Sequence, residues 1–233
     1  MKRYAIIVAG GSGRRMQVSD TLSQLAKQFI SIGGKPILMH TIERFAAPSQ
    51  GSLFGTPTIV VLPEKDFPTW ERLCREHHFH IPVQLVAGGN TRFQSVKNGL
   101  AAIKGDGLVA IHDGVRPFVS SDIIERSFQV AAEKGTAVAA VPLKDSVRLV
   151  EASSNRALDR SQLRLIQTPQ TFQLSLIQQA FQVEESPNFT DDASVAERAG
   201  FPIYLIDGSY ENIKITTPED LLWAEAFTMN NEQ

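Results

Sequence analysis

The feature that most constrains this chain is an apolar run that enters a glycine-rich loop close to the N-terminus. Ala5 to Ala9 are consecutive apolar residues, and Gly10-Gly11-Ser12-Gly13-Arg14-Arg15-Met16 follow at once. A continuous apolar run suits a central strand covered on both faces, and open α/β sheets bind ligands beyond the carboxyl ends of their strands. Glycine lets backbone N–H groups approach a ligand, and arginine adds a planar cation that matches phosphate oxygens. The stretch therefore predicts an α/β fold with an anion site beside its first strand.

Three common motifs do not fit this loop. A dinucleotide-binding fingerprint needs glycine where Met16 stands, and a P-loop needs glycine at Phe29 and a hydroxyl residue at Pro36. A nucleophile elbow needs glycine two residues before and two residues after its serine, and the loop around Ser12 does not provide this spacing. What remains is a glycine loop with arginines and, further along, Lys27, which together suit a multiply charged phosphate. The alternative is a tight turn with solvated arginines.

Composition limits the class of protein. The chain has 233 residues, of which 42% are hydrophobic, and its formal net charge is −2, which argues against a nucleic-acid-binding protein. We expect one domain spanning residues 1–233. The single Cys74 cannot form an intramolecular disulfide and suits a reducing compartment, and no apolar stretch approaches the ~20 residues of a membrane span. The sequence thus predicts a cytoplasmic protein with no nucleic-acid or membrane partner.

Alternating apolar and amphipathic segments predict a mostly parallel sheet covered by helices. The expected strands after the first are Pro57 to Leu62, Val83 to Ala87, Leu108 to His112, Thr136 to Leu143, Pro202 to Ile206 and Asn212 to Ile215. The expected helices include Pro36 to Phe45, Lys65 to His78, one that begins near Arg92, Thr190 to Ala199, and a last one capped by Thr217.

Two of these strands end in residues that suit a charged ligand. Gly88-Gly89 precede Arg92 and Ser95 at the start of a helix, where the macrodipole disfavours a cation unless an anion is bound there. Asp113 follows another strand and is a candidate ligand for a divalent metal. Asp122 and Glu125 have the spacing of a capping box, so we interpret them as structural.

Residues 144–171 interrupt the alternation of strands and helices. Charged side chains are interspersed there with Val147, Leu149, Val150, Leu163 and Leu165. This pattern predicts a hairpin arm that projects from the sheet, and its apolar positions need a partner to cover them. We therefore expect a homodimer.

The whole set of motifs resembles the 2-C-methyl-D-erythritol 4-phosphate cytidylyltransferase family. The matching blocks are Ala9 to Met16, Lys27-Gln28-Phe29, Gly88-Gly89 with Arg92 and Ser95, His112 to Pro117, Asp159-Arg160, Gln167 to Gln170, and Asn212 to Lys214. The resemblance implies a Rossmann-like nucleotidyltransferase fold and a homodimer joined by the arms. It also implies the reaction, in which CTP and methylerythritol phosphate give the CDP-alcohol and pyrophosphate with Mg²⁺ as cofactor.

The resemblance also assigns roles to individual residues. It implies that Arg15 and Lys27 stabilise charge on the α-phosphate, whereas Arg160 from the partner's arm and Lys214 hold the attacking phosphate. Binding of the cytidine and its phosphates would fall to Ala9, Gly10, Gly11, Gly13, Gly89, Arg92 and Ser95. Asp113 would face the metal, and the remaining substrate-binding candidates are Arg116, Ser146, Thr168 and Thr190.

The sequence departs from the family pattern at three places. Ala26 stands where a proline is usual, and the segment between Met16 and Lys27 is longer than expected. Ser146 replaces a threonine, and Asn90 replaces an acid found in some relatives. A ribitol-5-phosphate cytidylyltransferase is the nearest alternative, but Asp159-Arg160 and the block that begins at Gln167 are more similar to the methylerythritol enzymes. A dinucleotide-dependent oxidoreductase and a non-catalytic nucleotide-binding protein are more distant alternatives.

Overall fold

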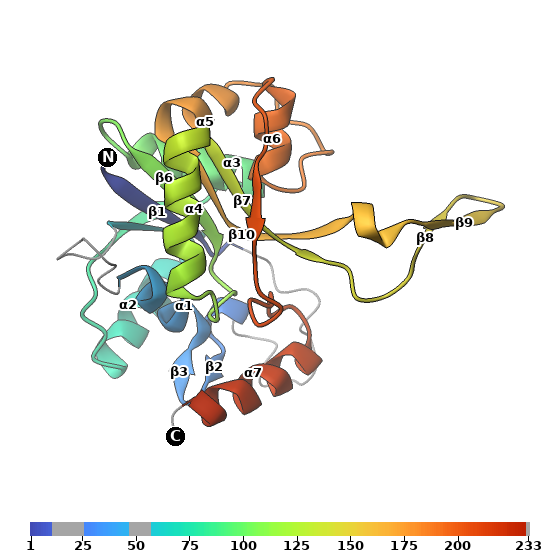
Figure 1. Cartoon of the computed structure of the whole chain (residues 1–233). Coiled ribbons are helices and arrows are strands. Elements are labelled where there is room, and N and C mark those ends of the chain that lie inside the picture. The colour runs from blue at the N-terminus through green and yellow to red at the C-terminus, as the bar shows by residue number, and fades with distance from the viewer. Residues whose placement is uncertain (11–25, 47–56, 232–233) are drawn as a thin grey trace.

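A central sheet crosses the protein in its computed structural model, which describes residues 1–10, 26–46 and 57–231 (Figure 1). Within these residues the sheet has seven strands in the order β11-β7-β10-β6-β1-β4-β5. Strand β10 runs antiparallel to both of its neighbours, and the other pairs are parallel. The predicted Rossmann-like α/β class with a mostly parallel sheet is confirmed.

The elements follow one another largely as expected. The strands are β1 (Arg3–Val8), β2 (Ser31–Ile32), β3 (Lys35–Pro36), β4 (Thr58–Leu62), β5 (Val83–Ala87), β6 (Leu108–Asp113), β7 (Thr136–Pro142), β8 (Val147–Val150), β9 (Asn155–Leu158), β10 (Arg164–Gln173) and β11 (Leu205–Asp207). The helices are α1 (Ile37–Ala46), α2 (Phe67–Glu76), α3 (Arg92–Ala102), α4 (Ser121–Lys134), α5 (Leu174–Ala180), α6 (Asp192–Arg198) and α7 (Pro218–Asn231), with 3₁₀ turns at Lys27–Phe29, Glu64–Asp66 and Arg160–Gln162. None of these helices is long and apolar enough to cross a membrane.

Helices cover both faces of the sheet, as the unbroken apolar run of β1 requires. Successive side chains of a strand point to opposite faces. Ala5 and Ile7 pack in a buried cluster with α1, α2 and α4, whereas Ile6 packs in a second cluster with α3, α5 and α6. The first strand therefore lies in the centre of the molecule, and its carboxyl end is the natural place for a ligand.

The last helix packs on a small layer of its own. Ala224 of α7 joins a third buried cluster with Ile32 of β2, Phe118 and Ile215. A hydrogen bond from the Gly33 N–H to the carboxylate of Glu225, 3.0 Å long, ties the turn between β2 and β3 to the same helix. This contact holds α7 against the rest of the fold, and the buried Ile215 fixes the segment before α7, which contains Lys214.

The predicted arm is present. The β8–β9 hairpin projects from the body of the molecule (Figure 1), and Leu149 and Val150 on it are exposed. The arm is shorter than the predicted range 144–171, because residues 164–171 belong to β10 and pair with β7 in the central sheet.

The predicted capping box at Asp122 and Glu125 is wrong. Helix α4 is capped by Ser120, whose hydroxyl accepts a hydrogen bond from the Ile123 N–H at 3.3 Å. Glu125 instead accepts two hydrogen bonds from the guanidinium of Arg3, at 2.6 and 2.8 Å, and thereby joins α4 to the start of β1. Asp122 forms an exposed ion pair with Arg126 one turn along α4, at 2.8 Å, so the two acids act separately.

The predicted strand at Asn212 to Ile215 does not form, and the preceding strand is confined to β11. Backbone groups of this segment find other partners. The Asn212 carbonyl accepts from Arg116 at 2.7 Å, and the Ile215 N–H donates to the Val115 carbonyl at 2.9 Å. Because these partners satisfy the backbone, the segment can follow the loop after β6 without joining the sheet.

His112 is a fully buried polar residue near the end of β6. Its Nε2 lies 3.1 Å from the Arg116 carbonyl, which can only accept, so this nitrogen carries the proton. Nδ1 then accepts the hydroxyl hydrogen of Thr168 at 3.0 Å, and the ring of Phe45 lies 5.0 Å away between centroids. Burial lowers the pKa of His112 from 6.5 to about 4, so the imidazole is neutral at pH 7.

We expect His112 to make the stability of the protein depend on pH between 6.5 and 4. In this range His112 binds a proton in the unfolded chain but not in the folded protein. The contribution of the neutral His112 to the free energy of unfolding is therefore complete above pH 6.5 and is lost as the pH falls toward 4. The loss amounts to about 3 kcal/mol of unfolding free energy. Urea unfolding at a series of pH values measures this loss, and the unfolding free energy of the His112→Gln variant should fall less steeply as the pH is lowered.

The control is His80→Gln, which changes an exposed histidine and should show the same dependence on pH as the wild type. An equally steep fall in unfolding free energy for His112→Gln and the wild type would contradict this account.

Candidate active site

Two pockets lie beyond the carboxyl ends of the central strands. The first, of about 280 Å³, is lined by Ala9 and Gly10 after β1, by Lys27, by Gly89, Asn90, Arg92 and Ser95 around the start of α3, and by Asp113 and Lys214. The second, of about 230 Å³, is lined by Arg116, Gln167, Thr168, Gln170, Thr190 and Asp191. Arg92, Asp113 and Lys214 line both pockets, so these three side chains form the boundary between them.

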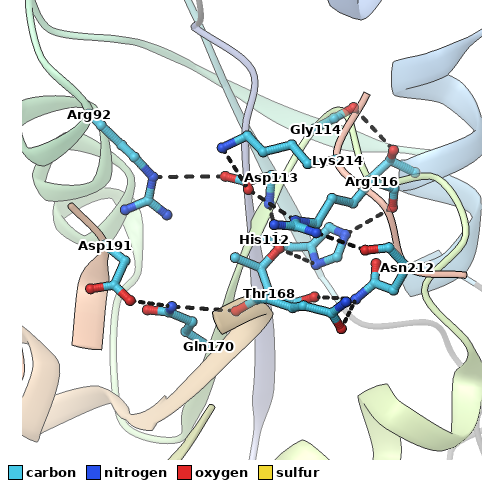
Figure 2. A network of polar contacts seen from close by, with 12 residues as sticks. Arg92, His112, Asp113, Gly114, Arg116, Thr168, Gln170, Asp191, Asn212 and Lys214 are labelled. Carbon is cyan, nitrogen blue, oxygen red and sulfur yellow. Dashed lines mark hydrogen bonds and ion pairs between the residues drawn. The ribbon is translucent and has the colours of Figure 1, made fainter. Parts of the chain in front are cut away.

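Asp113 is the centre of the charged network that Figure 2 shows. Its Oδ2 accepts from Lys214 Nζ at 3.0 Å and from Arg116 Nε at 3.2 Å, and its Oδ1 lies 3.8 Å from Arg92 Nε. Burial alone would raise the pKa of this carboxyl, but the three cations hold it well below its usual range. Asp113 is therefore ionised, and it brings together cations from three parts of the chain.

Arg92, the first residue of α3, already has an anionic partner within the protein. Its two terminal nitrogens donate to the carboxylate of Asp192 at 2.8 and 2.7 Å. The cation at this helix start was the basis on which we expected an external anion. The structure corrects that argument, because the buried Asp192 balances the charge and Thr91 caps the helix. Arg92 nevertheless stays 29% exposed at the pockets.

The glycine turn before α3 is shaped by Ser95. The Ser95 hydroxyl donates to the Thr91 carbonyl at 2.8 Å and accepts from the Gly89 N–H at 3.1 Å. A Cβ atom added at Gly89 would lie 2.3 Å from Cβ of Gln94, a distance that atoms cannot adopt without a shift of the backbone. The turn thus requires glycine, and Ser95 holds it in place from within the first pocket.

Lys27 lies in the first pocket, in a 3₁₀ turn after Ala26. Ala26, which replaces the proline usual in the family, has φ −63° and ψ 137°. Proline fixes φ near this value, so the backbone keeps the conformation that proline would impose. Gly11, Gly13 and Arg15, together with the long segment before Lys27, lie outside the residues that the structure describes.

Thr168 and Thr190 both line the second pocket, but their hydroxyls differ in availability. The buried Thr168 hydroxyl donates to His112 and accepts from the Asp113 N–H at 3.1 Å, so it connects the core to the site. Thr190 is exposed to solvent. Of the two, Thr190 is better placed to offer a hydroxyl to a ligand.

Ser146 and Arg160 are not brought to either pocket of their own chain. Both are exposed on the arm, and the Arg160 guanidinium donates to the carbonyl of Lys144 at the arm's base. The other predicted site residues that the structure describes all line one of the two pockets.

Sequence reasoning missed Asp192 and Gln170. Gln170 is almost fully buried; it donates to Asp191 at 2.9 Å and accepts from the Ala193 N–H at 2.8 Å, which fixes α6 against β10. The sequence did contain a signal for both residues. Two adjacent acids, Asp191 and Asp192, open a helix that faces the basic motif at Arg92, but we interpreted them only as a helix start.

The donor set at Asp113 does not fit a direct metal ligand. A divalent cation at this carboxylate would displace Lys214 or Arg116 and would stand beside the charge of Arg92. The described residues also contain no group of three or more His, Cys, Asp or Glu side chains that could hold an ion.

Comparisons with known proteins agree with this geometry. Residues 4–230 match the family model IspD, 2-C-methyl-D-erythritol 4-phosphate cytidylyltransferase. The enzyme of that name from Bacteroides fragilis is 46% identical over 226 residues, which are 97% of this chain and 99% of the relative. Its counterpart from Bacteroides thetaiotaomicron is 45% identical over 221 residues, which cover 95% of this chain and 97% of the relative.

Solved structures show the same fold. The 4-diphosphocytidyl-2C-methyl-D-erythritol synthase of Anaerococcus prevotii superimposes with a TM-score of 0.80 at 27% identity, over 98% of this chain and 96% of that one. The 2-C-methyl-D-erythritol 4-phosphate cytidylyltransferase of Thermus thermophilus superimposes with a TM-score of 0.76 at 29% identity, over 98% of this chain and 100% of that one. With its two pockets meeting at Asp113 and a match that spans almost its whole length, the chain belongs to the 2-C-methyl-D-erythritol 4-phosphate cytidylyltransferase family.

Proposed function

We propose that this protein transfers CMP from CTP to 2-C-methyl-D-erythritol 4-phosphate and releases pyrophosphate. The product is 4-diphosphocytidyl-2-C-methyl-D-erythritol. The observation that carries the proposal is the pair of adjoining pockets that share Arg92, Asp113 and Lys214 in a member of this family. A transfer between two substrates needs both to be held side by side, and this boundary is where they would meet.

The first pocket suits the nucleotide. Backbone N–H groups of the glycine turn and the end of β1 can approach a base and phosphates, and Lys27 supplies a cation on the same side. The second pocket suits the sugar-alcohol phosphate, because Arg116 and Lys214 supply cations and Thr190 supplies a hydroxyl.

The reaction needs positioning and charge stabilisation rather than a protein nucleophile. An oxygen of the methylerythritol phosphate attacks the α-phosphorus of CTP in line, the bond to the β-phosphate oxygen breaks, and pyrophosphate leaves. We propose that Lys27 and Arg15 stabilise the charge that builds on the α-phosphate. Lys214 and Arg116 orient the attacking phosphate, and Arg160 reaches it from the arm of a second copy.

We propose a single domain over residues 1–233 that works as a homodimer, because the arm carries exposed Leu149 and Val150. Mg²⁺ would enter with the CTP phosphates, which are its common ligands, rather than through Asp113. A cytoplasmic location suits a chain with one cysteine and a nucleotide substrate.

The substrate itself is tested by pyrophosphate release. With CTP and Mg²⁺, we expect release when methylerythritol phosphate is present and none when ribitol 5-phosphate replaces it, because every named relative above acts in methylerythritol chemistry. Release with ribitol 5-phosphate alone would assign the chain to the alternative substrate. No release with either would contradict the transferase function.

Variants of the two pocket lysines should separate their roles. Lys27→Met should lower kcat by about 100-fold or more with little change in KM for CTP, because its interaction strengthens in the transition state. Lys214→Met should mainly raise KM for the sugar-alcohol phosphate, by about 10-fold or more. Steady-state kinetics measure both, and Lys97→Met on the exposed face of α3 is the control. An equal loss of CTP affinity in both pocket variants would show that the roles are assigned wrongly.

A further inference from the structure

A buried carboxylate holds one edge of the Arg92 guanidinium. Nη1 donates to Oδ1 of Asp192 at 2.8 Å and Nη2 donates to Oδ2 at 2.7 Å, so the planar fork meets both oxygens. Asp192 is completely buried, whereas Arg92 keeps 29% of its side chain exposed. One edge of the guanidinium is therefore fixed within the fold, and the rest of the group faces the pockets.

We propose that Asp192 is a positioning residue of the active site, which holds Arg92 as the wall between the nucleotide pocket and the sugar-phosphate pocket. This inference rests on the proposed function for the identity of the two ligands. Arg92 lines both pockets and Asp192 lines neither, so Asp192 acts on a bound substrate only through Arg92.

The position of Asp113 explains why Arg92 needs a second anchor. Asp113 Oδ1 lies 3.8 Å from Arg92 Nε, and the same carboxylate accepts from Lys214 at 3.0 Å and from Arg116 at 3.2 Å. Without Asp192, the nearest carboxylate for Arg92 is Asp113. In that case the guanidinium would move toward Asp113 and away from its present position in the pocket wall, and it would compete with Lys214 for the Asp113 carboxylate. Asp192 prevents this collapse by holding the fork from the opposite side.

Stability alone accounts poorly for this ion pair. Buried ion pairs stabilise little relative to apolar residues of similar volume, and the helix macrodipole opposes a cation at the first position of α3. The same chain offers a comparison, since Arg3 and Glu125 form another two-pronged pair, at 2.6 and 2.8 Å. That pair joins the start of β1 to α4 and lines neither pocket, so it is structural.

The test is a double-mutant cycle in the full chain, read as kcat/KM for methylerythritol phosphate well below each variant's Tm. Asp192→Asn keeps the size of the side chain but removes its charge and one acceptor oxygen. We expect it and Arg92→Met each to lower kcat/KM by about 10- to 100-fold, with no further loss in the double variant. Glu125→Gln, which breaks the comparison pair, should lower Tm and leave kcat/KM within about 2-fold of wild type.

Two results would overturn the proposal. The first is an Asp192→Asn variant that loses stability, as Glu125→Gln does, but keeps the kcat/KM of the wild type. The second is multiplicative losses in the double variant, which would show that Asp192 does not act through Arg92. If Asp192→Asn does not fold, Arg92→Lys replaces it as the test variant, because lysine keeps the charge but lacks the planar fork that meets both carboxylate oxygens of Asp192. It should lose as much kcat/KM as Arg92→Met, and a wild-type value would also overturn the proposal.

A binding measurement separates this inference from the proposed reaction. If the wild type releases no pyrophosphate with any substrate, the proposed function is wrong, but CTP binding by calorimetry still reports on the wall of the first pocket. Weaker CTP binding in both Asp192→Asn and Arg92→Met, with unchanged binding in Glu125→Gln, supports the positioning role. Unchanged binding in Asp192→Asn alongside a loss in Arg92→Met overturns it.

Discussion

The site depends on one ionised carboxylate, Asp113, at the carboxyl end of a central strand. Its three cationic partners come from α3, from the loop after β6 and from the segment before α7, and the two arginines among them are anchored in turn. Arg92 is fixed by Asp192, and Arg116 is fixed by the carbonyl of Asn212. Because an unpaired buried charge is costly, this network is complete only when elements far apart in the sequence have packed correctly. The requirement couples the geometry of the site to the assembly of the fold.

The same strand connects the site to the hydrophobic core. His112 precedes Asp113 and hydrogen bonds to Thr168, whose hydroxyl also accepts from the backbone N–H of Asp113. A neutral, fully buried imidazole therefore supports the backbone of the central carboxylate. Alternate residues of a strand face opposite sides of the sheet. The charged Asp113 at the end of β6 therefore faces the pockets, whereas the preceding residue, His112, is buried in the core.

The sequence predicted what depends on local pattern and missed what depends on distant partners. Apolar runs located the strands of the sheet other than β10, which was taken as part of the arm. The rule that ligands bind beyond carboxyl ends predicted that Arg92 and Asp113 lie in one cleft, and Lys214, which only the family resemblance pointed to, lines it as well. Spacing also predicted a capping box at Glu125, but this carboxylate pairs with Arg3 from another element. The partner of Arg92 was missed for the same reason, because Asp192 follows it by 100 residues and no local pattern joins them. The strand expected at Asn212 to Ile215 failed because the Arg116 side chain and the backbone of the loop after β6, rather than a neighbouring strand, satisfy its backbone groups.

The arm differs from the rest of the fold, because its apolar side chains have no covering layer within the described part of the chain. An isolated two-stranded hairpin is only marginally stable in water, and the β8–β9 hairpin exposes Leu149 and Val150. A second copy packed on these side chains would stabilise the hairpin and cover its apolar surface. Ser146 and Arg160 lie on the same arm and line neither pocket of their own chain. The role proposed for Arg160 links dimerisation to catalysis, since a contact that orders the arm would also bring a cation to the neighbouring site.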